Sequence, residues 1–102
     1  MAPELVKVEN LATQGRLREA ETVCLAYLQG QRDSAHAYYM LGRVRDLQDD
    51  SGAAQLYRKA LYLDPQHCQA LLRLSALAEK DGNLQQARLY EERARRSQPR
   101  EE

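Results

Sequence analysis

The sequence predicts an all-α protein in which three helix-turn-helix repeats, six antiparallel helices in total, form a short right-handed solenoid. Three observations support this fold class. The composition is 43% hydrophobic and 29% charged, with no Phe and no Trp, which is typical of amphipathic helices. Small and turn-forming residues recur at intervals of 33 or 34 positions. Apolar residues within each interval follow the spacing of a helix face.

Several residue types show the repeat independently of one another. Gly15 and Gly82 are separated by 67 positions, which is one interval of 34 and one of 33. The same period appears in three further series: Ala20, Ala53 and Ala87; Tyr27, Ala60 and Ala94; Arg32, Pro65 and Pro99. We therefore expect a single domain, 1–102, with repeats at about 1–33, 34–66 and 67–99 and a tail at 100–102.

The first repeat is expected to contain one helix from about Pro3 to Thr13 and a second from Leu17 to Gln29. Proline is tolerated in the first turn of a helix. The break Gln14-Gly15-Arg16 separates the two apolar patterns. Gly30 is expected to end the second helix, because glycine is common directly after the last helical residue.

In the second repeat, Ser34 is expected to cap a helix over 35–47, since its hydroxyl can accept a hydrogen bond from a backbone N–H of the first turn. The polar run 48–51 predicts a turn, one residue shorter than its counterparts. A helix from Gly52 to Leu63 follows, and the pair Asp64-Pro65 stops it.

The third repeat follows the same scheme, with a helix from about Gln66 to Lys80, a turn at 81–83 and a helix from Leu84 to about Ser97. In this last helix, Glu91 and Arg95 stand where the earlier repeats have apolar residues. Because the end of a solenoid must present a polar face to water, we expect the array to terminate here.

Small residues are expected where paired helices cross, since two helices approach closely only at such positions. Gly42 and Ser75 take this position on the first helices of their pairs, and Ala53 and Ala87 on the second helices. The side chains expected to fill the surrounding core are Tyr38, Leu41, Leu56, Tyr57, Leu61, Leu71 and Leu74.

The sequence offers no pattern of reactive residues that would support catalysis. Cys24 and Cys68 fall on helical patterns in different repeats, so we interpret them as small core residues. Together with His36 and His67 they show no recognised metal-ligand spacing, and the glycines form no phosphate-binding loop. We expect no catalytic, cofactor or metal site in this chain.

The charge and hydropathy patterns also narrow the range of partners. Fifteen basic residues balance fifteen acidic ones, which argues against nucleic acid as a partner. No apolar run has the length of a membrane span. We therefore expect a cytoplasmic protein that does not insert into a membrane.

The second repeat resembles the tetratricopeptide signature. The run Ala37-Tyr38-Tyr39-Met40-Leu41-Gly42 is followed, at the spacing of that family, by Ala53, Tyr57 and the run Ala60-Leu61-Tyr62-Leu63-Asp64-Pro65. The resemblance extends over almost the whole chain, although the third repeat departs from the pattern at Ser75, Ala78 and Glu91. It implies a stack of helix pairs whose role is to bind other proteins.

A narrower resemblance lies in the run Ala60-Leu61-Tyr62-Leu63-Asp64-Pro65-Gln66-His67 together with Ala70-Leu71-Leu72-Arg73-Leu74. These phrases are similar to the C-terminal repeats of CheR-type chemoreceptor methyltransferases, and within that group to those of the Wsp surface-sensing, biofilm-related pathway. The resemblance implies a non-catalytic C-terminal part of an enzyme that transfers a methyl group from S-adenosylmethionine to receptor glutamates. The alternatives are a free-standing adaptor and a self-association module that forms a weak homodimer.

In tetratricopeptide arrays the first helix of each pair lines a concave groove. The outward positions expected to form it here are His36, Tyr39, Arg43, Asp46, Gln69, Leu72, Arg73, Ala76 and Glu79, joined by Leu5, Glu9 and Ala12 of the first pair. The two arginines, the tyrosine and the leucines suit an acidic or mixed peptide of a receptor or another signalling protein. Chaperone-binding members of the family hold a terminal carboxylate with Lys and Asn where this chain has Leu5 and Glu9, so we do not expect that ligand.

Overall fold

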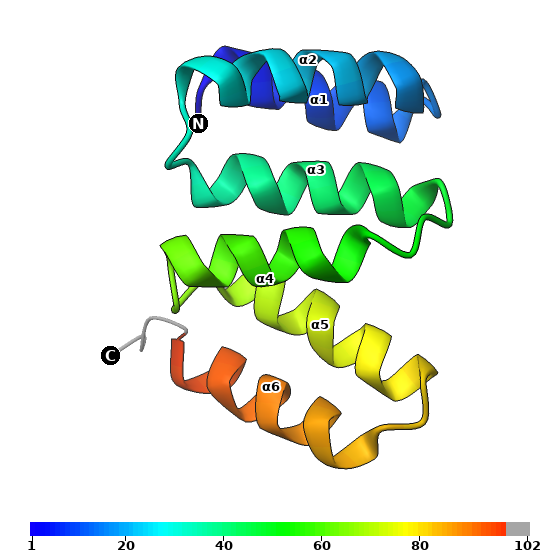
Figure 1. Cartoon of the computed structure of the whole chain (residues 1–102), viewed down its shortest axis with the longest axis vertical. Coiled ribbons are helices and arrows are strands. Elements are labelled where there is room, and N and C mark those ends of the chain that lie inside the picture. The colour runs from blue at the N-terminus through cyan, green and yellow to red at the C-terminus, as the bar shows by residue number, and fades with distance from the viewer. Residues whose placement is uncertain (98–102) are drawn as a thin grey trace.

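The computed structural model describes residues 1–97, which form three pairs of α-helices. The helices are α1 (Pro3–Thr13), α2 (Leu17–Gly30), α3 (Ala35–Leu47), α4 (Ala53–Leu63), α5 (Cys68–Lys80) and α6 (Leu84–Ser97). Consecutive helices pair as α1 with α2, α3 with α4 and α5 with α6, and the pairs stack along the long axis of the molecule (Figure 1). The predicted all-α array of three helix pairs is confirmed. Pro99 and the predicted tail at 100–102 lie outside the described residues.

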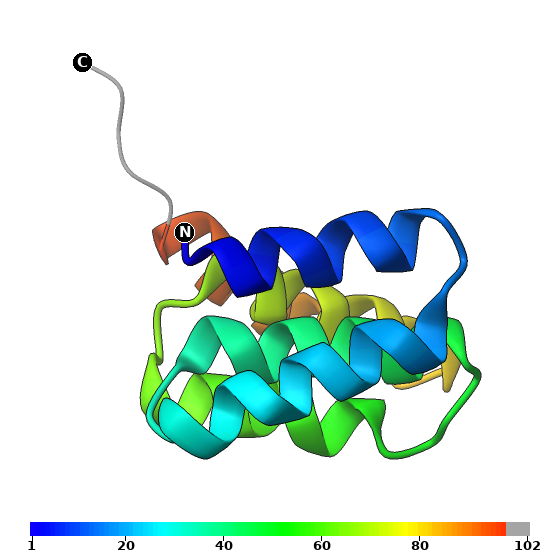
Figure 2. The same cartoon turned by 90° about the horizontal axis from the view of Figure 1, so that it is seen from above.

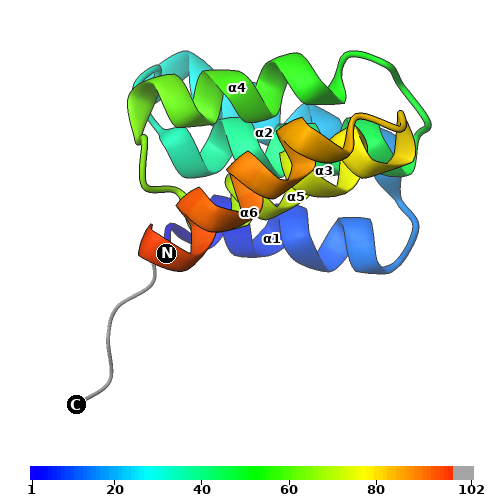
Figure 3. The ribbon, with the colours of Figure 1, turned by 90° about the horizontal axis from the view of Figure 1, so that it is seen from below.

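The stack has two ends, and Figures 2 and 3 look along it from one end and from the other. Helices α1 and α2 lie nearest the viewer in Figure 2, and α6 lies nearest in Figure 3. Between pairs, α2 contacts α3, α4 contacts α5, and the first helices α1 and α3 also contact each other. The three pairs therefore share one continuous core.

Side-chain caps decide where two of the first helices begin. The Ser34 hydroxyl accepts a hydrogen bond from the Ala37 backbone N–H at 3.2 Å, which confirms the predicted start of α3. Helix α5 begins at Cys68, and the predicted start at Gln66 is wrong. The reason is that Nδ1 of His67 accepts the Ala70 backbone N–H at 3.1 Å, which makes His67 the N-cap.

The turns within the pairs share one backbone feature. Gly15 and Gly82 have positive φ angles of 77° and 79°, as a tight turn after a helix requires. In the second pair, Asp49 occupies the equivalent place and takes the same left-handed conformation with φ of 58°. The following Gly52 donates its backbone N–H to Asp50 Oδ1 at 2.8 Å. Gly52 is therefore the N-cap of α4, and the prediction that it lies inside the helix is wrong.

The crossing of α3 and α4 shows why small residues were expected there. The fully buried ring of Tyr57 lies directly over Gly42, so that a Cβ at Gly42 would be 2.7 Å from the ring. In the third pair, the hydroxyl of Ser75 donates to the Ala87 carbonyl at 2.9 Å. The core prediction fails for Tyr38, which is only half-buried and packs against the edge of the core. Leu56 behaves in the same way.

Helix α6 closes the described array with a polar surface. Glu91 and Arg95 are both exposed, as predicted from their substitution for apolar residues. The buried residues of this helix are Ala87 and Ala94, which both face α5 and the core. Leu84 and Leu89, in contrast, are large apolar side chains that remain about half exposed.

Candidate functional site

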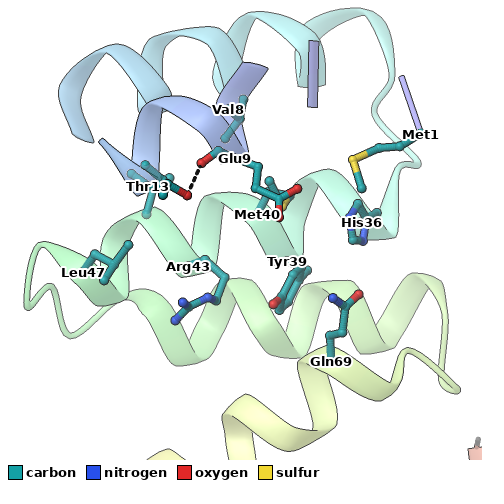
Figure 4. A pocket seen from close by; sticks show the side chains of 12 residues that line it. Met1, Val8, Glu9, Thr13, His36, Tyr39, Met40, Arg43, Leu47 and Gln69 are labelled. Carbon is teal, nitrogen blue, oxygen red and sulfur yellow. Dashed lines mark hydrogen bonds between the residues drawn. The ribbon is translucent and has the colours of Figure 1, made fainter. Parts of the chain in front are cut away.

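A pocket of about 480 Å³ lies where α1, α3 and α5 meet. Figure 4 shows Glu9 and Thr13 of α1 on one side, His36, Tyr39 and Arg43 along α3, and Gln69 of α5 on the other side. Its remaining lining residues are mainly apolar: Met1, Val8, Ala12, Met40, Val44 and Leu47. The pocket thus combines an apolar floor with a few polar and charged groups, as binding sites for peptides and small ligands commonly do.

The sequence predicts nine groove positions on the second and third pairs, and the structure brings four of these side chains together in the pocket. His36, Tyr39, Arg43 and Gln69 all line the pocket. Leu72 is exposed but does not line it. The other predicted positions that do not line the pocket are Asp46, Arg73, Ala76 and Glu79. From the first pair, Glu9 and Ala12 line the pocket, whereas Leu5 is buried in the core with 3% of its surface exposed. The interpretation of Leu5 as an outward position is therefore wrong.

Tyr39 is buried, although the sequence predicts that it faces outward from α3. Only 8% of its surface is exposed, because its ring packs among three other rings. The ring centroids lie 5.4 Å from His36, 5.0 Å from His67 and 6.0 Å from Tyr57. Tyr39 therefore forms the packed wall of the pocket, and it connects α3 with α4 and with the start of α5.

Asp46 explains why Arg73 is absent from the pocket. Its Oδ2 accepts hydrogen bonds from the Arg73 guanidinium at 2.6 Å and from the Tyr57 hydroxyl at 3.0 Å. Burial, and secondarily the charge of Asp46, raises the pKa of Tyr57 to about 12. Arg73 thus joins α5 to α3, while Arg43 is 4.0 Å from the same carboxylate and lines the pocket.

The chain's two histidines contact each other at the edge of the pocket, with Nδ1 of His36 3.1 Å from Nε2 of His67. Their hydrogen-bond partners define the tautomers. Because Nδ1 of His67 accepts the Ala70 N–H, the proton of the neutral ring is on Nε2, which donates to Nδ1 of His36. Burial lowers the pKa of both imidazoles below their ordinary value, and the neighbouring His36 lowers that of His67 further.

The cysteines have the structural environment expected of core residues. Cys24 is fully buried, its thiol donates to the Ala37 carbonyl at 3.3 Å, and burial raises its pKa to about 11. Cys68 is half-buried, and its sulfur lies 3.7 Å from the Ala94 carbonyl. Within residues 1–97, no three His, Cys, Asp or Glu side chains are grouped so that they could hold a metal ion. Over the same residues, no helix is long and apolar enough to span a bilayer.

Sequence reasoning missed the roles of His67 and Asp46. The two histidines are 31 positions apart, which is not a repeat interval, so comparing equivalent positions does not pair them. A local signal for His67 did exist, because it directly precedes α5 and is three positions before the amide that it caps. Asp46 is predicted as a groove position, and its bonds to Tyr57 and Arg73 have no local signal, since these partners come from two other helices.

Comparison with known proteins shows clear relatives in sequence. The chain is 43% identical over 94 residues to the "probable biofilm formation methyltransferase WspC" of Pseudomonas putida KT2440, and 40% identical over 94 residues to that of Pseudomonas aeruginosa PAO1. Each match covers 91% of this chain but 22% of the relative. The chain thus spans about a fifth of the length of these relatives. No family model matches the sequence.

Solved structures identify the fold. Two solved structures of the type III secretion translocator chaperone SycD from Yersinia enterocolitica superpose with TM-scores of 0.82 and 0.81. Both are 16% identical to this chain and cover 92% of it, with 72% and 66% of the chaperone chain matched. At this identity the likeness concerns the fold. The chain is therefore a tetratricopeptide-type helical domain that is homologous to a segment of the WspC biofilm-formation methyltransferases.

Proposed function

We propose that this chain is the non-catalytic, C-terminal interaction and regulatory part of a cytoplasmic CheR-type methyltransferase. The parent enzyme would transfer methyl groups from S-adenosylmethionine to glutamates of a chemoreceptor. The observation that carries the assignment of the parent is the homology to WspC, which covers 91% of this chain and only 22% of the enzyme. In this proposal, catalysis and binding of S-adenosylmethionine belong to the remaining part of the enzyme.

The interaction role rests on the pocket between α1, α3 and α5. Arg43 is the cation best placed to meet a partner there. Asp46 bonds Arg73 at 2.6 Å, whereas it lies 4.0 Å from Arg43. The guanidinium of Arg43 therefore has N–H groups available for a carboxylate of the partner. Leu47, which is half exposed, offers an apolar contact on the same wall. We therefore propose that the pocket binds a peptide segment with an acidic side chain beside an apolar one, from a receptor or another signalling protein.

Selection from a random-sequence peptide library at neutral pH, followed by calorimetry, tests this site. We call the strongest binder the groove peptide. Arg43→Ala should weaken its binding about tenfold or more, because a charge-assisted hydrogen bond contributes about 1.5 to 3 kcal/mol. The matched control is Arg58→Ala, an exposed arginine of α4 outside the pocket. Equal effects of the two substitutions, or an unchanged affinity in both, would overturn the proposal that the peptide binds in this pocket.

A second pair of variants tests the apolar part of the pocket. Leu47→Asp should abolish binding of the groove peptide, because it places a charge where we expect an apolar side chain of the partner. Leu25→Asp is the control, since Leu25 is similarly exposed on α2 and does not line the pocket. Circular dichroism of both variants verifies that the helices are retained.

The assignment to a methyltransferase is tested separately from the groove. The reading frame should continue far upstream and encode the catalytic part, whereas a free-standing adaptor predicts a frame of about this length. In the full-length enzyme, Arg43→Ala should lower methyl transfer to the receptor at limiting receptor concentration. A short reading frame would refute the parent assignment and favour the adaptor.

Self-association is a second candidate function, favoured by the exposed Leu84 and Leu89 of α6. One of the matched chaperone structures is described as an "alternative dimer", which is a property of that protein. Sedimentation of this chain at several concentrations decides the matter, because a weak homodimer gives a sedimentation coefficient that rises with concentration. Leu89→Lys should then abolish the rise.

A further inference from the structure

Two side-chain contacts join α3 to α5. Near the start of α3, Nε2 of His67 donates to Nδ1 of His36, and near its end the Arg73 guanidinium donates to Asp46. Tyr39 lies between these contacts and packs on both histidine rings. The contacts therefore hold the third helix pair against the second at the place where the wall of the pocket passes from α3 to α5.

The two contacts differ in how they respond to protons. In the tautomers defined above, each histidine ring has one nitrogen free of hydrogen, and in both rings it is Nδ1. A proton on Nδ1 of His36 would face the N–H of His67 Nε2, so that two donors would meet and the hydrogen bond between the rings would be lost. A proton on Nδ1 of His67 would remove the acceptor of the Ala70 N–H, and with it the cap of α5. The Asp46–Arg73 contact contains no imidazole.

Charged groups around the pair act in both directions. For His36, burial lowers the pKa most strongly, the Glu9 carboxylate of α1 raises it, and the amino terminus lowers it. For His67, burial and the positive charge of a protonated His36 lower the pKa, while Asp64 at the end of α4 raises it. The net direction is downward for both rings, so the unfolded chain binds protons more readily than the folded chain. The contribution of the two imidazoles to the free energy of unfolding is complete above their ordinary pKa of 6.5. It is lost as the pH falls through the pKa values that the rings have in the folded chain.

We propose that the His36–His67 contact is a proton-sensitive latch on the pocket. With both rings neutral, the latch holds the start of α5 against α3. Proton uptake by either ring opens it, frees the first turn of α5 and weakens binding of the groove peptide. The last step rests on the proposed function, whereas the latch itself is a property of the chain alone.

The latch is tested first without any partner, by NMR of the 102-residue chain. Between about pH 7.5 and about pH 5.5, the range in which imidazoles titrate, the hydrogen-exchange protection factor of the Ala70 amide should fall about tenfold or more. Both histidine ring signals should titrate together with this loss. Constant protection of Ala70 through the titration of the rings would overturn the latch.

The variant His67→Asn keeps an N-cap on α5 but removes the imidazole that takes up the proton. Asparagine is a good N-cap and accepts the Ala70 N–H without taking up a proton in this range. We expect its Ala70 amide to remain protected at both pH values, with a urea midpoint that is less dependent on pH than that of the wild-type chain. A pH-dependent loss of protection in His67→Asn equal to that of the wild type would also refute the latch.

The link to the pocket is tested with the groove peptide. Its affinity for the wild-type chain should fall at least about threefold from about pH 7.5 to about pH 5.5. The doubly substituted chain, His36→Gln with His67→Asn, reports the pH dependence of the peptide itself and should show a smaller fall. An equal fall in both chains would refute the coupling. If the library yields no peptide that depends on Arg43, the proposed function fails, while the Ala70 amide still decides the latch.

Discussion

Replacing Gly42 by alanine tests how tightly α3 and α4 are packed. The added Cβ would lie 2.7 Å from Cε1 and 2.8 Å from Cδ1 of Tyr57. The ring cannot move aside freely, because it is fully buried and its hydroxyl is bonded to Asp46 at 3.0 Å. Overpacking of this kind costs about 1 to 3 kcal/mol. Alanine regains about 0.5 to 1 kcal/mol of helix propensity over glycine, so we expect a net loss of up to about 2.5 kcal/mol.

The control for this substitution is Gly30→Ala at the end of α2. No atom lies within 4 Å of the Cβ that it would add, so this variant should be neutral or slightly more stable than the wild type. Urea unfolding followed by circular dichroism gives both free energies. Gly42→Ala with the same stability as Gly30→Ala would refute the close packing of Tyr57 on Gly42. In a Tyr57→Leu background, the penalty for Gly42→Ala should largely disappear, as a double-mutant cycle would show.

The further predictions each concern a single side chain. Asp46→Ala should lower the free energy of unfolding by about 1 to 3 kcal/mol, because it removes the acceptor of Arg73 and Tyr57; a urea midpoint equal to that of the wild type would contradict this. Asp49→Gly should stabilise the chain by up to about 1 kcal/mol, since φ is 58° there and glycine adopts that conformation without strain; a lower thermal midpoint would disprove it. At mildly alkaline pH, Ellman's reagent should modify one thiol of the folded chain quickly and leave Cys24 protected by burial. The free energy of unfolding should also decline as the pH rises from 9.0 to about 11, because the Cys24 thiol keeps its proton to a higher pH in the folded chain than in the unfolded chain.

Much of this fold could be predicted because the determining signals are local or periodic. The bounds of α1, α3 and α6 agree with their predicted ranges, since apolar spacing and turn residues mark them in the sequence. Helix α2 extends one residue beyond its predicted end, so that Gly30 is its last residue and Gln31 is the C-cap. The other errors occur at helix starts. His67 and Gly52 lie just outside α5 and α4, because each takes part in a cap or turn hydrogen bond whose geometry the sequence does not reveal.

The candidate site was less predictable than the fold. Periodicity identifies the face of a helix to within about one side chain, since successive residues are separated by about 100° around the axis. The spacing therefore predicts an outward Tyr39, although its ring is almost completely buried. Arg73 was predicted to bind a partner, whereas the structure shows its guanidinium bonded to Asp46.

The sequence by itself determined the three helix pairs, the small residue at the crossing of α3 and α4, and the polar surface of the last helix. Each of these depends on residue type at a repeated spacing. Only the tertiary structure decided that Asp46 joins three helices and that His36 meets His67, 31 positions away. Such contacts depend on how one helix pair is rotated against the next. That rotation is set by the packing of many side chains at once, so no single motif in the sequence specifies it.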